Sequence, residues 1–135
     1  MWLSLIIAAQ AHPFESKLYG HQTTLWLGEE SVIVEYAVEV PTPRLLAEIR
    51  DALTGAPTQA DQDAFNARMH RDLRDALRLR IDEEAQSWSR AEPTEDSGRG
   101  DAKFIVYRLL LEAPLPDEAR TLQLVDGNYL SLIHI

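Results

Sequence analysis

The chain has 135 residues, no cysteine and a formal charge of −9 at pH 7. This length allows one domain with a substantial hydrophobic core. The acidic balance argues against nucleic acid or an anionic membrane surface as the main partner, because either would be repelled. Without cysteine, the chain forms no disulfides, thiolate metal sites or cysteine nucleophiles.

The N-terminal residues resemble the end of a signal peptide. Residues 2–9 form a short apolar run, and the small residues Ala9 and Ala11 stand three and one positions before His12, as a signal peptidase requires. The run is too short to cross a bilayer, which takes about 20 apolar residues. No Lys or Arg precedes it, which leaves open that the sequence begins inside the signal peptide. The alternative is a buried N-terminal strand.

We therefore expect three parts in the chain. Residues 1–11 are the signal peptide, and residues 12–129 form a single β-rich domain that is exported to the periplasmic or extracellular face of the membrane. The tail, residues 130–135, reads LSLIHI and looks like translated sequencing-adapter read-through. His134 in this tail is therefore given no function.

Two alternating segments predict a β-hairpin. Residues 17–27 are expected to form a strand with apolar side chains on both faces, and residues 28–31 form the loop. Residues 32–40 alternate valine and tyrosine with mostly polar positions, which predicts a half-buried strand. A one-residue slip would expose the valine face, so the pairing register is well specified. Pro41 and Pro43 should end the strand, because proline donates no ladder hydrogen bond.

Two helices are expected next. Residues 42–55 begin with a threonine-proline cap and end near a glycine and a proline. Residues 58–77 predict a longer helix with a helical apolar stripe at Phe65, Met69, Leu73 and Leu77. Its polar side carries arginines that are followed four residues later by aspartates, which predicts the ion pairs Arg68 with Asp72 and Arg71 with Asp75.

The remaining segments return to strand-like alternation. They comprise a strand from about residue 77 to 82, a long polar loop or irregular hairpin over 83–101 around Trp88, a central strand over 103–112, a short strand over 121–125, and a turn at 126–128. With both helices placed after the first hairpin, this order predicts an α+β fold. We expect an antiparallel sheet or open β-sandwich with a two-helix insertion.

The histidines are the candidates for metal chemistry. After cleavage, His12 would offer a free amine and an imidazole, which together chelate Cu(II) or Ni(II). His21 in the first strand could approach it if the chain folded back. The alternative is that His12 simply begins an extended segment and His21 is hydrogen-bonded within its strand. These two histidines lack a third ligand. His70, beside the apolar stripe of the long helix, is expected to be structural.

No catalytic constellation is present, so the chain is expected not to be an enzyme. Nucleophile elbow, P-loop, dinucleotide and HExxH patterns are absent. The paired carboxylates lie in turn-like places, where acids are usually solvated. Residues 126–129 offer oxygen atoms but are too few for a calcium loop.

Several fragments together resemble a known family. They are AHP at the cleavage site, a histidine nine positions later, YAVEVPTP over 36–43 and TLQLVDGNY over 121–129. The chain resembles the extracytoplasmic N-terminal domain of HupE/UreJ-like membrane proteins and their uncharacterised relatives. In this family an exported β-rich domain precedes transmembrane helices, and the usual association is with nickel or with hydrogenase and urease maturation.

The resemblance carries over to eight positions, namely His12, Pro13, His21, Glu39, Pro41, Asp126, Asn128 and Tyr129. The family's usual glycine-asparagine pair is replaced by residues 14–16 (FES). The resemblance implies a non-enzymatic extracytoplasmic domain involved in metal transport or metalloenzyme maturation, with Ni or Cu as a possible ion and no required cofactor. Its partner would be a transmembrane region of the same protein or another membrane protein. Two alternatives remain open: a secreted binding domain of unknown ligand, and a copper site on His12 with oxidative activity.

Overall fold

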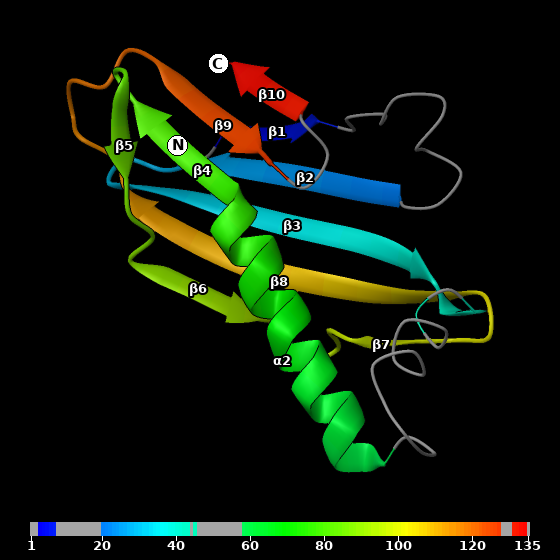
Figure 1. The fold of residues 1–135 in the computed structure, drawn as a ribbon. Coiled ribbons are helices and arrows are strands. Elements are labelled where there is room, and N and C mark those ends of the chain that lie inside the picture. Colours follow the sequence, from blue (N-terminus) through cyan, green and yellow to red (C-terminus); the bar gives the residue numbers. More distant parts are fainter. Residues whose placement is uncertain (1–2, 8–19, 44, 46–57, 128–130, 135) are drawn as a thin grey trace.

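The described part of the chain folds into two antiparallel sheets that pack face to face, with helix α2 (Gln59–Ala76) lying beside the smaller sheet (Figure 1). The computed structural model describes residues 3–7, 20–43, 45, 58–127 and 131–134. The larger sheet comprises β1 (Leu3–Ile7), β2 (Gly20–Leu27), β3 (Ser31–Pro41), β8 (Phe104–Pro114), β6 (Arg90–Pro93) and β7 (Arg99–Gly100). The smaller sheet comprises β10 (Ser131–His134), β9 (Leu122–Asp126), β4 (Leu77–Ile81) and β5 (Glu84–Gln86). The predicted α+β sandwich is therefore confirmed.

Strand β3 lies in the middle of the larger sheet, between β2 and β8. It pairs with β2 in a tight hairpin, with Leu25 opposite Val34, and with β8 along its whole length. Its even-numbered side chains from Val32 to Val40 are all buried, because they face the second sheet and the helix. The predicted burial of the valine face and the central place of β8 are both confirmed. Pro41 is the last residue of β3, as expected from its missing N–H.

Helix α2 (Gln59–Ala76) starts where the sequence predicts. Thr58 caps it by accepting from the Asp61 N–H while the Asp61 carboxylate accepts from the Thr58 N–H, so orphan donors at both residues are satisfied. At its other end the helix passes directly into β4, and the Leu77 N–H donates to the Arg74 carbonyl. Phe65 and Leu73 of the predicted stripe are buried against the larger sheet.

The ion pairs predicted on α2 are wrong in their spacing. The Arg71 Nε lies 3.8 Å from the carboxylate of its neighbour Asp72, and the Arg74 Nη2 lies 3.0 Å from the carboxylate of its neighbour Asp75. Arg68 instead places its guanidinium 5.1 Å from the centroid of the Phe65 ring, a favourable cation–π distance. These pairs are exposed, so they contribute little to stability.

Most of the first predicted helix lies outside the described residues. Thr42, Pro43 and Leu45 have helical backbone, and Leu45 is buried. Of the two helices in the predicted insertion, only the second, α2, lies wholly within the described residues.

The segment predicted as a long loop or irregular hairpin connects the two sheets. It forms β5 on the edge of the smaller sheet, then β6 and β7 against β8 of the larger one. A tight turn at Asp82 and Glu83, both with positive φ, sends β5 back along β4. Because these strands are short and polar, no periodic pattern marks them in the sequence.

Both ends of the described chain pair as edge strands. Residues 3–7 form β1 against β2, which matches the alternative of an N-terminal strand, while cleavage after Ala11 stays a prediction. In the tail set aside above, β10 pairs with β9, and His134 stands opposite Gln123.

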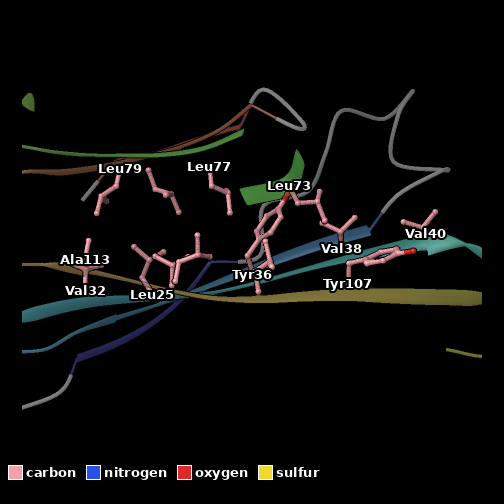
Figure 2. Packing of buried hydrophobic residues seen from close by; sticks show 14 of the residues in the cluster. Leu25, Val32, Tyr36, Val38, Val40, Leu73, Leu77, Leu79, Tyr107 and Ala113 are labelled. Atoms are coloured by element: carbon pink, nitrogen blue, oxygen red, sulfur yellow. The ribbon is translucent and has the colours of Figure 1, made fainter. Parts of the chain in front are cut away.

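The core lies between the two layers (Figure 2). Leu77 and Leu79 of β4 point from the smaller sheet toward Leu25 and Val32 of the larger one, and Leu73 reaches in from α2 near Val38. Burial of these side chains is the main stabilising contribution to the fold.

A hydrogen bond between two buried polar side chains crosses this core. The Tyr36 hydroxyl donates to the Asp126 Oδ2 at 2.8 Å, and the two residues are 0% and 2% exposed although 90 positions apart in sequence. The bond joins β3 of one sheet to the end of β9 in the other. Loss of this donor would remove one hydrogen bond from a buried carboxylate, which destabilises the folded state.

We expect Tyr36→Phe to lower the free energy of unfolding by about 1–3 kcal/mol, because the buried Asp126 carboxylate loses a hydrogen bond. Tyr107→Phe is the matched control, since the Tyr107 hydroxyl donates to Asn66, which is partly open to water. Urea denaturation of both variants measures the difference. An effect of Tyr36→Phe no larger than that of Tyr107→Phe would contradict the prediction.

Candidate functional site

Two of the residues singled out in the sequence line the same small hollow. His21 and Glu39 both lie beside a space of about 180 Å³ at the end of the β2–β3 hairpin that is farthest from its loop. Glu39 stands opposite Gly20 and Val106, so its carboxylate lies on the outer face of the sheet, where the hollow is. His21 stands opposite the buried Val38, so its imidazole points to the other face of the same sheet.

Gly20 makes room for the carboxylate in this hollow. A Cβ at position 20 would lie 3.2 Å from the Glu39 Oε2, so a larger residue there would crowd it. Arg108 also lines the hollow, but its Nε lies 3.6 Å from the Asp96 carboxylate, which partly neutralises it. Imidazole nitrogen and carboxylate oxygen are ligands that Ni, Cu and Zn accept. Within the described ranges, no three His, Asp or Glu side chains are grouped closely enough to hold a metal ion.

Of the other predicted positions, the two that the structure describes do not line this hollow. Pro41 ends β3 opposite Phe104, and Asp126 is buried in its bond to Tyr36. His12, Pro13, Asn128 and Tyr129 lie outside the described residues. Asp126, predicted as part of a turn, thus joins the two sheets.

His70 forms a polar contact between α2 and the larger sheet. Its Nε2 shares a hydrogen bond with the Ser97 hydroxyl, and its ring meets Tyr107 edge-on at 5.5 Å. The Ser97 oxygen also accepts from the Arg108 N–H at 2.8 Å. A serine beside a histidine is the start of a nucleophilic triad, but this serine oxygen is held by a backbone amide. The contact fixes the helix to β8, which agrees with the structural role expected for His70.

Sequence reasoning missed a second, larger hollow. An open groove of about 810 Å³ lies between the end of α2, strands β4 and β5, and Trp88. Arg74, Arg78 and Arg80 border it. The alternation of β4 carries a signal for the last two, because burial of Leu77 and Leu79 sends Arg78 and Arg80 to the opposite face. The remaining walls come from segments that the sequence does not place together.

No protein-family model matches the chain, and no curated protein or solved structure is significantly similar to it. Among the described residues, none of the helical structure is long and apolar enough to cross a membrane.

The stability of the fold should depend on the protonation of His70. Burial lowers the pKa of His70 below its ordinary value of 6.5, so the unfolded chain binds a proton more readily than the folded one. The stabilisation is fully present above pH 6.5 and is lost as the pH falls from there through the lowered pKa. Urea denaturation between about pH 5 and 8 measures this slope. In His70→Gln the slope over this window should be reduced, and an unchanged slope would contradict the assignment.

Proposed function

We propose that this chain is a non-enzymatic domain on the extracytoplasmic side of a membrane-anchored protein, where it handles a transition-metal ion such as Ni²⁺ or Cu²⁺. The carrying observation is the hollow at the end of the β2–β3 hairpin, which the Glu39 carboxylate borders and which lies beside His21. His21 and Glu39 are both among the positions that match in the resemblance to HupE/UreJ-like domains, and this resemblance supports the same function.

The chemistry of the hollow supports metal handling better than catalysis. It offers one carboxylate, from Glu39, while the His21 imidazole lies on the other face of the same sheet, so an ion bound there would complete its coordination with water or with a further chain segment. Such an incomplete ligand set favours binding and release over tight storage. His12, with its amine and imidazole after cleavage, is the predicted source of further ligands.

Metal titration tests this proposal. Isothermal calorimetry with Ni²⁺ and with Cu²⁺ should show binding to the full chain, and Glu39→Gln should weaken it by at least about tenfold, as loss of a ligand does. The matched control is Glu35→Gln, which removes a carboxylate from the same strand at a position that does not line the hollow.

The variant His12→Ala, which removes the predicted ligand at the mature N-terminus, distinguishes metal binding at the N-terminus from metal binding at the hollow. If His12→Ala abolishes binding while Glu39→Gln leaves it unchanged, the hollow is not the site. If neither Ni²⁺ nor Cu²⁺ binds the unsubstituted chain measurably at millimolar metal concentration, the metal-handling function is wrong.

Export is tested by the N-terminus of the protein recovered from cells. We expect the exported chain to begin at His12, as measured by intact mass after fractionation of a bacterial host. Ala11→Asp should block cleavage, because the signal peptidase requires a small residue at that position. A full-length chain recovered from the cytoplasm in both cases would contradict export.

A further inference from the structure

The groove beside Trp88 is positively charged in a chain that is strongly acidic. Arg74, Arg78 and Arg80 border it together with one acid, Asp75, although the whole chain carries −9. Asp75 is held by Arg74 at 3.0 Å, so the charge of that arginine is largely balanced. The two arginines of β4 therefore provide the net positive charge of the groove.

Arg78 and Arg80 have no anionic partner in the described part of the chain. They project from the exposed face of β4, two positions apart. Their cross-strand neighbours are Val125 for Arg78, and Gln123 and Ala85 for Arg80, none of which is acidic. Two guanidinium groups side by side without a carboxylate repel each other, and an anion placed between them would relieve this repulsion.

Most of the remaining lining of the groove is apolar, with Gln86 and Ser87 as its uncharged polar residues. Leu77 and Leu79 contribute from the core edge, and Ala91 and Val125 add small apolar walls. The Trp88 indole N–H donates to the Leu77 carbonyl at 3.1 Å, which holds the ring in place beside β4. An apolar wall with a few charged groups at its border is the usual composition of a small-molecule site, and the volume lies within the usual range.

We propose that this groove binds a small organic acid, with its carboxylate between Arg78 and Arg80 and its apolar body against Trp88. The planar fork of arginine pairs with a carboxylate through two parallel hydrogen bonds. A long polyanion fits less well, because the remaining surface of the chain would repel it. The groove shares no lining residue with the His21 hollow, so the proposal is independent of the metal site.

Calorimetry with matched probes tests the groove. We expect 2-naphthoate to bind the full chain, and its neutral amide, 2-naphthamide, to bind at least about tenfold more weakly. Inorganic phosphate, which lacks the apolar body, should also bind more weakly than 2-naphthoate. Decanoate serves as a second acid with an aliphatic body.

Two double variants separate the groove from the general charge of the protein. Arg78→Gln/Arg80→Gln should weaken 2-naphthoate binding by at least about tenfold. Arg71→Gln/Arg99→Gln removes the same charge outside the groove and should leave the affinity unchanged. All four side chains are exposed, so the fold should persist, and thermal melting of each variant checks this.

A third variant fills the groove with an internal carboxylate. Val125→Glu places an acid directly opposite Arg78, and it should abolish binding of the probe without lowering the melting temperature. The proposal is overturned if neither acid binds at millimolar concentration, or if the amide or phosphate binds as tightly as 2-naphthoate. It is also overturned if the control double variant weakens binding as much as the β4 double variant.

Discussion

Burial of one face of β3 is the constraint on which the rest of the structure depends. Side chains on a strand alternate between its faces, so enclosing the valines of β3 fixes the faces of β2 and β8 that pair with it. The smaller sheet and α2 must then supply a complementary apolar surface, which Leu79 and Leu73 help to form. The same alternation sends the intervening side chains outward, and Arg78 and Arg80 reach the surface for this reason.

The hydrogen bond between Tyr36 and Asp126 fixes how the two sheets are aligned on each other. Apolar packing alone tolerates sliding of one sheet over the other, since one aliphatic contact resembles the next. The bond from Tyr36 to Asp126 requires one position of β9 over β3. Asp126 also stands opposite Leu77 in the β4–β9 pairing, so the start of β4 is placed by the same residue. One buried carboxylate thus orients three strands.

The parts of the fold that could be predicted are those with a local cause. The β2–β3 hairpin follows from alternation, and the start of α2 from the pairing of Thr58 with Asp61. The assignment of each strand to one of the two sheets could not be predicted, because it depends on the turn at Asp82 and on strands too short to show a period.

The candidate sites divide in the same way. His21 and Glu39 could be named singly, but the faces on which they lie depend on the register that sets Gly20 opposite Glu39 and His21 opposite Val38. The groove brings together residues from α2, β4, β5, β6 and β9. The shape of the groove is therefore a property of the tertiary structure. In the sequence, Arg78 and Arg80 look like ordinary solvent-facing positions of a half-buried strand.

The junction between α2 and β4 has a consequence for how this chain tolerates insertions. No linker separates Ala76 from Leu77, and the Gly127 N–H donates to the Ala76 carbonyl at 2.9 Å, which ties the junction to the end of β9. An extra residue in most connections is absorbed by a loop. Here it would turn β4 over, carrying its arginines into the core and its leucines into solvent. The length of this junction is therefore as tightly constrained as the identity of any buried residue.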